Sequence, residues 1–393
     1  MGELGSTKEM VPLPLSALLS QVLVAYTVEL DNGFELRMVR AGFPGARLSL
    51  VLWLNVLRLL PSEGLTFRDL ADRYVGPPDS LKIQLGYLER WWVIEMSSGN
   101  PTSRQKRDGW GSGRGITRST TIQLTTIGKK AVEIWPVLLS EIEDRWRKRF
   151  EKEEIHRISK SLQKIVQSSE VELPLGLSSI LDLDEREYKP RPAKKEAPLA
   201  FVMLVSQVLF LFAGEFQKRS RLPLLICANM IRVLGENPVR LGDLPRLTGG
   251  SAETSDVGWR LKPFVILEND PAGKRGKVIR LSERGARAQD AYYQTTRDIE
   301  KDWAEKFGAD NIRGLRSNLE KLLARKEFSL GLVPPKGVAR GGTPTPALGR
   351  RDVGVAAKQR MHDLVEQTQR FIEAPRESLP HYPMWDFNRG FGP

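Results

Sequence analysis

The chain has 393 residues, which is more than one ordinary domain needs and favours two or three domains. Its 60 lysines and arginines outnumber its 48 aspartates and glutamates, so the formal charge is +12, which favours a polyanionic partner, nucleic acid first and an anionic membrane surface second. The single cysteine, Cys227, excludes an internal disulfide framework and a multi-cysteine metal cage, and fits a reducing compartment.

The N-terminal segment predicts no secretory signal, because no basic cluster leads into an apolar core and a cleavage site. Two apolar runs, at 11–28 and 198–212, each contain a Ser-Gln pair and fall short of the roughly 20 clean apolar residues that a membrane span needs. We therefore expect both runs to be buried helices of a cytoplasmic, nucleoid-associated protein without a membrane partner.

The first part of the chain predicts helices at about 13–38, 48–60 and 66–74. A fourth helix is expected after Gly76-Pro77-Pro78, with Asp79 or Ser80 available as its cap, so that two short helices flank a tight turn as in a helix-turn-helix. The apolar segment WWVIEM, a basic Gly-rich loop and the alternating strand TTIQLT then predict a two-stranded β-wing. A long charged helix at about 126–168 closes this part.

The second part repeats this order. Helices are expected at about 198–219, 223–235, 241–247 and after Gly249-Gly250, followed by a wing built from FVILEND and KVIRLS and by a long helix at about 283–325. Three phrases recur at matching places: SQVLVAY (20–26) with SQVLFLF (206–212), NVLRLL (55–60) with NMIRVL (229–234), and IQLTTIGKKA (122–131) with IRLSERGARA (279–288). The chain therefore contains an internal repeat whose insertions and deletions fall in loops.

These patterns divide the chain into four regions. We predict a first helix-turn-helix repeat with dimerisation-type helices at 1–169, a linker at 170–197 that turns from acidic to basic, and a second repeat at 198–325. A Gly/Pro-rich and aromatic tail with a candidate helix at about 351–373 occupies 326–393.

Each repeat resembles a winged helix-turn-helix domain of the MarR family of bacterial transcription regulators. The phrases that carry the resemblance are LTTIGKKAVEIWPVLLSEIEDRW and LSERGARAQDAYYQTTRDIEKDW, since in that family a strand ending in Leu-Thr leads within two or three residues to a Gly that starts a long dimerisation helix. The resemblance covers about 12–168 and 198–325. The chain departs from the family pattern in its long first wing and in the second wing tip, AGKRGK, which lacks the usual Asp-x-Arg.

The resemblance implies a mainly α fold with small β-wings, in which the two repeats form an intramolecular pseudo-dimer. Family members are ordinarily homodimers that read two halves of a near-palindromic operator. We therefore expect a sequence-specific regulator that binds double-stranded DNA, either as one chain acting as a pseudo-dimer or as a homodimer. A small-molecule effector is a further candidate partner, because clefts between the helical core and each winged lobe commonly bind ligands in such proteins.

Base reading is expected from polar side chains on the exposed N-terminal face of the fourth helix of each repeat, and phosphate contacts are expected from the basic wings. In the first repeat Leu81, Leu85 and Leu88 form the inward stripe of that helix. The fourth helix of the second repeat also carries Glu253 and Asp256, which repel phosphates, so we expect it to read DNA more weakly. The candidate DNA-binding residues are Ser80, Lys82, Gln84, Tyr87 and Arg90, with the wing residues Arg104, Lys106, Arg107, Arg114 and Arg118, in the first repeat, and Ser255, Arg260 and Lys262, with Lys274, Arg275 and Lys277, in the second.

Other chemistries find little support. The three histidines, His156, His362 and His381, have neither metal-ligand nor triad spacing, so we expect no enzyme activity, no metal and no cofactor. Cys227 lies in the apolar stretch LLICANMI, which predicts a buried and unreactive thiol. The effector cleft would be lined by aromatic residues, for which ordinary core packing is the alternative: Trp53, Trp91, Trp92 and Trp135 in the first repeat, and Phe212, Phe216 and Trp259 in the second.

A second function is compatible with the same features. A winged-helix module can act as an architectural factor that coats DNA without sequence preference, or as a protein-interaction module. Such a role would depend on total charge and salt rather than on particular bases.

Overall fold

The computed structural model of the chain describes residues 12–43, 48–97, 115–177, 192, 199–220, 222–235, 237–244, 247, 261–270 and 276–325, with the backbone of 385–386 and 390–391. The protein is mainly helical with small antiparallel sheets. We call residues 12–177 the first half and residues 199–325 the second half.

The first half contains six helices in the part that the structure describes: α1 (Leu15–Arg40), α2 (Leu50–Asn55), α3 (Phe67–Arg73), α4 (Pro78–Arg90), α5 (Thr126–Arg149) and α6 (Lys152–Gln167). A 3-10 turn follows α2 at Leu57–Leu59. Its three strands are β1 (Leu65–Thr66), β2 (Ile94–Ser97) and β3 (Thr121–Leu124).

The described residues of the second half form the helices α7 (Phe201–Arg219), α8 (Leu224–Asn229), α11 (Glu283–Phe307) and α12 (Ala309–Ala324). Two 3-10 turns lie at Ile231–Val233 and Leu241–Asp243, the second at the start of the helix expected at 241–247. The strands are β4 (Val239–Arg240), β5 (Val265–Asn269) and β6 (Lys277–Leu281). Near the C-terminus β7 (Trp385–Asp386) pairs with β8 (Gly390–Phe391), which lies beside α1 and α2.

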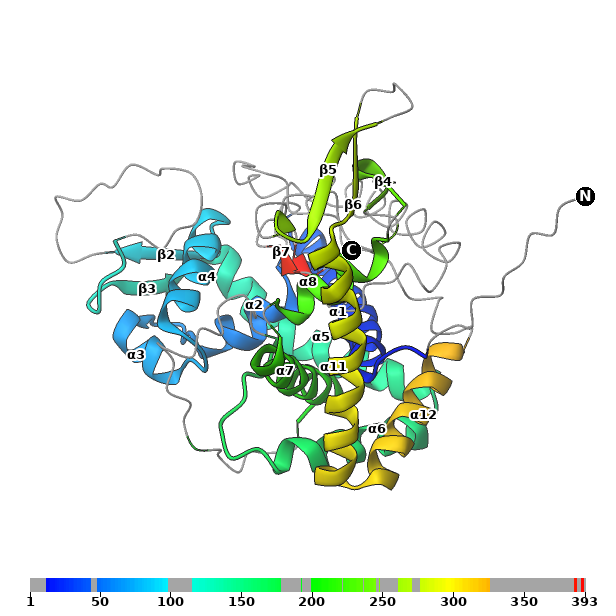
Figure 1. Cartoon of the computed structure of the whole chain (residues 1–393). Coiled ribbons are helices and arrows are strands. Elements are labelled where there is room, and N and C mark those ends of the chain that lie inside the picture. Colours follow the sequence, from blue (N-terminus) through cyan, green and yellow to red (C-terminus); the bar gives the residue numbers. More distant parts are fainter. Residues whose placement is uncertain are drawn as a thin grey trace, which may run out of the picture.

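The two three-stranded sheets have the same topology. The strand order is β1-β3-β2 in the first half and β4-β6-β5 in the second, and every pair is antiparallel. The registers also match, because Leu65 pairs with Ile122 and Val239 pairs with Ile279. Each sheet lies in a lobe at one edge of the molecule, the first at the left and the second at the top of Figure 1.

The recurring wing-to-helix phrase has a structural cause. Thr125 ends the first wing and its Oγ1 accepts the N–H of Gly128 at 3.1 Å, while in the second half Ser282 Oγ accepts the N–H of Gly285 at 3.2 Å. A Cβ atom at Gly128 would lie 2.1 Å from the carbonyl oxygen of Val93, and one at Gly285 would lie 2.0 Å from that of Phe264. Both halves therefore need a hydroxyl cap and, three residues on, a glycine.

The long closing helices are not continuous, which corrects the expectation of single helices at 126–168 and 283–325. Each breaks at a residue in the left-handed backbone region, Glu151 (φ 63°) in the first half and Gly308 (φ 96°) in the second. An α-helix cannot continue through that conformation, so the chain turns and α6 and α12 start anew. The two breaks are equivalent, since each lies 23 residues (151 − 128; 308 − 285) after its cap glycine.

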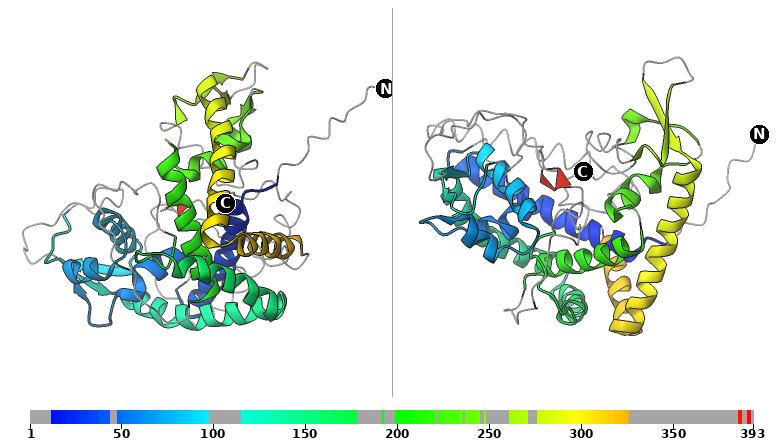
Figure 2. Two further views of the ribbon diagram at one scale, coloured as in Figure 1. Left: turned by 60° about the horizontal axis from the view of Figure 1, so that its bottom comes forward. Right: turned by 60° about the vertical axis from the view of Figure 1, so that its left-hand side comes forward.

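The helices of the two halves interlock around one core (Figure 2). α1 packs against α5 of its own half and against α7 and α12 of the second half, while α7 packs against α11 of its own half and against α1 and α6 of the first. Each of these contacts has a counterpart with the halves exchanged. The contact pattern of the helical core is therefore two-fold.

Polar and aromatic contacts follow the same two-fold pattern. The N–H of Leu15, at the start of α1, donates to Glu300 of the second half at 2.7 Å, and the N–H of Phe201, at the start of α7, donates to Glu143 of the first half at 3.4 Å. The ring of Trp146 lies 4.7 Å from that of Tyr26, and the counterpart pair of Trp303 and Phe212 lies at 5.3 Å.

Residues 171–177, at the start of the predicted linker, are part of this core. The side-chain amide of Asn55 accepts the N–H of Gly176 at 2.9 Å and donates to its carbonyl oxygen at 3.1 Å. Leu173, Leu175 and Leu177 are buried. The segment that follows α6 is therefore hydrogen-bonded to α2.

Within the described residues, α7 alone is long and apolar enough to cross a membrane by length and composition. It packs among α1, α6 and α11, and most of its apolar stretch is buried. Its burial agrees with the core role expected for the run at 198–212.

Candidate nucleic-acid interface

The helix pair α3–α4 lies beside the first sheet. α3 is capped by Thr66, whose Oγ1 accepts the N–H of Asp69 at 3.2 Å. α4 begins at Pro78, so Asp79 and Ser80, which the sequence offered as caps, lie in its first turn instead. The inward stripe of α4 is buried as predicted: Leu81, Leu85 and Leu88.

The expected exposure of three candidate base readers on α4 is wrong. Ser80, Gln84 and Tyr87 are 3%, 1% and 8% exposed. Gln84 donates its side-chain amide to the hydroxyl of Tyr74 at 2.7 Å, and the ring of Tyr87 lies 5.6 Å from that of Trp91. Helical spacing explains the burial, because positions 80, 84 and 87 form a second stripe next to the leucine stripe. These side chains therefore pack within the first half.

Two other candidates on α4 stay near the surface. Lys82 is half-buried and its Nζ lies 2.8 Å from a carboxylate oxygen of Asp79 one turn earlier. Arg90 is half-buried at the end of the helix. Of the five candidates on this helix, the cations are therefore the ones placed to meet a polyanion.

Two arginines, Arg68 in the first turn of α3 and Arg118 just before β3, form a basic pair. The N–H of Arg68 donates to the carbonyl oxygen of Arg118 at 3.1 Å, which brings two exposed arginines together from positions 50 residues (118 − 68) apart. Arg118 was predicted as a wing residue, whereas Arg68 was missed. Its signal was present in FRDLADRYV, where Arg68 and the exposed Arg73 stand on a short helix next to the expected reader.

Several predicted contacts lie outside the described residues. They comprise most of the first wing, the fourth helix of the second half and the tip of the second wing. The residues are Arg104, Lys106, Arg107 and Arg114 in the first half, and Ser255, Arg260, Lys274 and Arg275 in the second. Their roles stay predictions.

More of the described arginines and lysines form ion pairs in the second lobe than in the first. Arg280 on β6 lies 3.0 Å from Glu268 on β5, and Arg240 on β4 lies 3.1 Å from Asp270. The two predicted contacts that the structure describes here, Lys262 before β5 and Lys277 at the start of β6, are exposed. The two predicted contacts of the second lobe that the structure describes thus lie at the two ends of its hairpin.

The described residues contain one thiol and no cluster that could bind a metal ion. No three His, Cys, Asp or Glu side chains among them are grouped so as to hold a metal ion. Cys227 is 1% exposed, and burial raises the pKa of its thiol to about 12, partly offset by a hydrogen bond with Ser220. A thiol with so high a pKa is protonated near neutral pH and therefore unreactive, as the sequence predicted.

Of the six described aromatic residues that were expected in an effector cleft, four pack in the core. Trp135 stacks between Phe34 and Trp53, with ring centroids at 4.8 Å and 6.2 Å, and Phe212 and Phe216 are fully buried. Trp91 and Trp92 are half-buried at the end of α4, and Trp259 lies outside the described residues.

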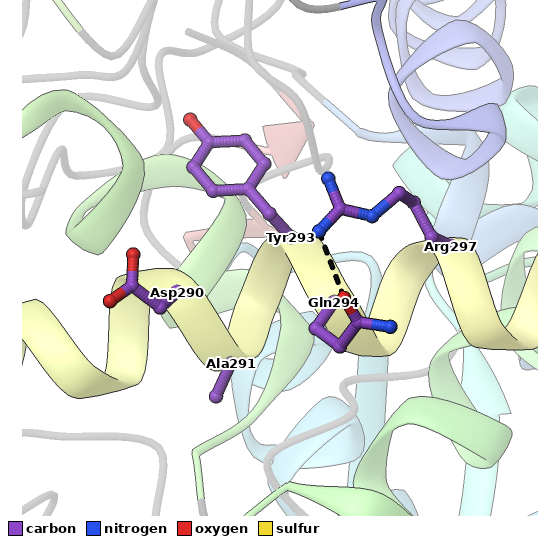
Figure 3. Close-up of a pocket in the computed structure, with 5 residues that line it drawn as sticks. All are labelled: Asp290, Ala291, Tyr293, Gln294 and Arg297. Carbon is purple, nitrogen blue, oxygen red and sulfur yellow. Dashed lines mark hydrogen bonds between the residues drawn. The ribbon is translucent and has the colours of Figure 1, made fainter.

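An open hollow of about 470 Å³ lies elsewhere, along α11 (Figure 3). The described residues that line it come from the outer side of this one helix, and Arg297 donates there to Gln294 at 3.0 Å. Burial raises the pKa of the lining residue Tyr293, an effect that Arg232 opposes. This hollow shares no residue with the predicted aromatic cleft, so an effector stays a prediction.

Comparisons with the models of protein families, with curated proteins and with solved structures found no match to this chain.

Proposed function

We propose that this chain is a sequence-specific transcription regulator that binds double-stranded DNA through two winged helix-turn-helix repeats paired within one chain. The observation that carries the proposal is the duplicated topology: each half has a short strand, a hairpin and a long closing helix in the same order, with sheet orders β1-β3-β2 and β4-β6-β5. A winged helix places its recognition helix directly before the wing hairpin, which is where α4 stands in the first half. The two-fold contacts of the core support a pseudo-dimer.

In this proposal α4 enters the major groove while the wings meet the phosphate backbone or the minor groove. Lys82 and Arg90 act from α4, and Arg68 and Arg118 bind phosphates beside it. In the second lobe, Lys262 and Lys277 bind phosphates. Two readers related by a two-fold axis would contact half-sites about one DNA turn, or roughly 34 Å, apart.

The basic pair provides the first test. Each phosphate contact contributes about 0.9 to the dependence of log affinity on log salt, so Arg68→Ala together with Arg118→Ala should lower that slope by about 1.8. The matched control is Arg313→Ala on α12, because Arg313 is also exposed but pairs with Asp310 far from the first lobe. Binding to labelled duplexes at several salt concentrations measures both. An unchanged slope in the double variant would exclude this pair from the interface.

The burial of Ser80, Gln84 and Tyr87 favours a second candidate function, a DNA-coating architectural or protein-interaction role, because it leaves α4 with few side chains that read bases. Replacing Lys82 or Arg90 with Ala distinguishes the two. A regulator should lose preference at particular base pairs, each worth about 1–3 kcal/mol, whereas an architectural protein should weaken equally on all sequences.

A further inference from the structure

The packing of α6 against α12 is two-fold in its backbone but not in its charges. The C-terminal end of α12 meets the start of α6, where Arg325 contacts Glu151 and Glu154. At the equivalent corner the second part of α6 lies beside the start of α12, and there Asn311 donates to the carbonyl oxygen of Ser161 at 3.4 Å.

The residues at the two corners differ in charge. Positions in the closing helices of the second half lie 157 residues (285 − 128) after their counterparts, so Ser168 corresponds to Arg325, and Gly308 and Asn311 correspond to Glu151 and Glu154. The first corner thus holds an arginine and two carboxylates at positions where the second holds a serine, a glycine and an asparagine. The second corner is not without charge, because Lys164 Nζ lies 3.3 Å from the place of a Cβ atom on Gly308.

At the charged corner one of the two carboxylates, that of Glu154, is buried. The Glu154 side chain is 4% exposed, and its Oε2 lies 2.5 Å from Arg325 Nη2, while its Oε1 has no hydrogen-bond partner in the described structure. Arg325 is 31% exposed and Glu151 69%, so the exposed carboxylate adds little. A buried carboxylate depends on its cation, because removing one partner of such a pair leaves an uncompensated charge.

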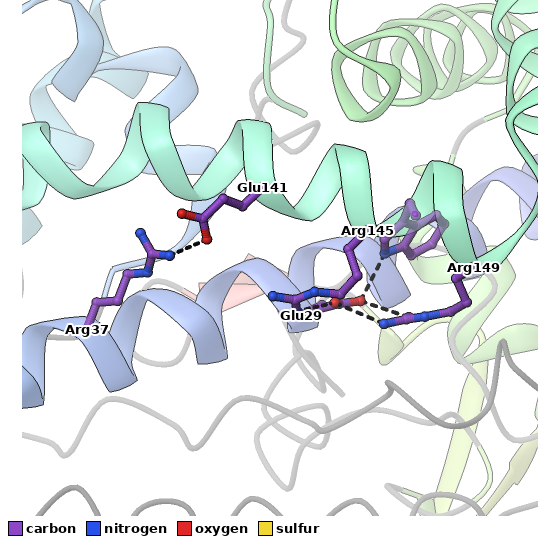
Figure 4. Close-up of polar contacts among 6 residues, drawn as sticks. Glu29, Arg37, Glu141, Arg145 and Arg149 are labelled. Carbon is purple, nitrogen blue, oxygen red and sulfur yellow. Dashed lines mark hydrogen bonds and ion pairs between the residues drawn. The ribbon is translucent and has the colours of Figure 1, made fainter.

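Contacts within one half do not determine which half it pairs with, because they form equally well when the partner is the second half of the same chain or a half of a second copy. The cluster that joins α1 to α5 is of this kind: Glu29 binds Arg145 and Arg149, and Arg37 binds Glu141 (Figure 4). Arg325 and Glu154 belong to different halves. If the first halves of two chains paired with each other, Ser168 would replace Arg325 beside Glu154 at both corners, and each buried carboxylate would lose its arginine. Lys164 would stand where Lys321 (164 + 157) stands now, and Lys321 makes no ion pair with Glu154 in the described structure.

We propose that the pair Glu154–Arg325 selects the second half of the same chain as partner of the first half, against the first half of a second copy. Each Glu154 without Arg325 should disfavour that competing arrangement about tenfold, less than for a fully buried ion pair because Arg325 is partly exposed to solvent. The inference rests on the paired-repeat organisation of the proposed function and not on DNA binding, so its test uses the protein without DNA.

Charge reversal tests the pair in the full-length chain. In Glu154→Arg and in Arg325→Glu alone, the corner holds like charges and the protein should be less stable. When the two variants are refolded together, each can supply the charge that the other lacks, so a species with twice the 44.3 kDa mass of one chain should form and contain both variants. The double variant E154R/R325E should return to one-chain mass and to a melting midpoint near that of the wild type. Light scattering and mass spectrometry of differently tagged chains measure this.

The control reverses a pair inside one helix, Asp310 and Arg313, which are 96% and 76% exposed, and should leave mass and midpoint unchanged. If a single reversal fails to fold, a double-mutant cycle with Glu154→Gln and Arg325→Gln replaces it, and their coupling should change the unfolding constant about tenfold or more. A wild type that is already a two-chain species through paired first halves, or the absence of both mixed species and coupling, would overturn the proposal.

Discussion

The joint between wing and closing helix yields the sharpest stability prediction. In Gly128→Ala the new Cβ would lie 2.1 Å from the carbonyl oxygen of Val93, about 1 Å closer than real Cβ contacts come. Since that neighbour is backbone, the start of α5 must move away from β2. Overpacking of this kind costs about 1–3 kcal/mol. Loss of the Thr125 cap, at about 1 kcal/mol, brings the expected destabilisation to about 2–4 kcal/mol.

The control for this change is Gly214→Ala. Gly214 lies inside α7 and a Cβ there would meet nothing within 4 Å, so alanine should stabilise by about 0.5–1 kcal/mol through helix propensity. Thermal unfolding followed by circular dichroism should show a midpoint lowered by about 4–16 °C for Gly128→Ala, taking a cooperative unit of 150–250 residues. A rise in the midpoint of Gly128→Ala, as in the control, would refute the close packing of this joint.

Three further predictions concern the helical core. Gly308→Ala should destabilise by about 1–2 kcal/mol, because the φ of 96° at this position before α12 suits glycine. Gly314→Ala, inside α12, has open space around the new Cβ atom and should not destabilise; urea unfolding compares the two variants. Burial raises the pKa of Asp31, although hydrogen bonds from Leu50 and Ser49 partly oppose the shift, so the folded state binds the carboxyl proton more tightly than the unfolded chain does. The free energy of unfolding should therefore fall as pH rises from about 3.9 through the folded pKa. Asp31→Asn should remove this fall, and a pH dependence unchanged by the substitution would contradict the prediction. Cys227, with a pKa of about 12, should react with a thiol reagent at pH 7.5 only on unfolding, and rapid labelling of the native protein would show that it is accessible.

The sequence predicted much of the fold because the residues that recur in the two repeats determine local structure, such as helix starts and strands. The Thr125–Gly128 and Ser282–Gly285 pairs mark the start of a helix, and alternating residues mark the hairpins. The breaks at Glu151 and Gly308 could not be predicted with the same ease, since a glutamate gives no local signal for a left-handed backbone.

The candidate site was harder to predict. The sequence identified α4 and its leucine stripe, but the polar residues Ser80 and Gln84 were expected at the surface because polarity usually means exposure. Their burial follows from a tertiary contact with Tyr74, which periodicity does not reveal. Likewise, the proximity of Arg68 to Arg118 depends on how β3 returns beside α3. The ion pair of Arg325 with Glu154 joins the end of α12 in the second half to the start of α6 in the first half, and the equivalent positions, Ser168 and Asn311, form no ion pair.

Selection of bound duplexes from a random DNA library by the full-length protein, with the mass of the complex determined in parallel, would show whether one chain reads a DNA sequence. We predict a motif of two unequal half-sites about one turn apart, bound by a single chain. No enriched motif, together with an affinity that falls uniformly as salt rises, would contradict sequence-specific reading.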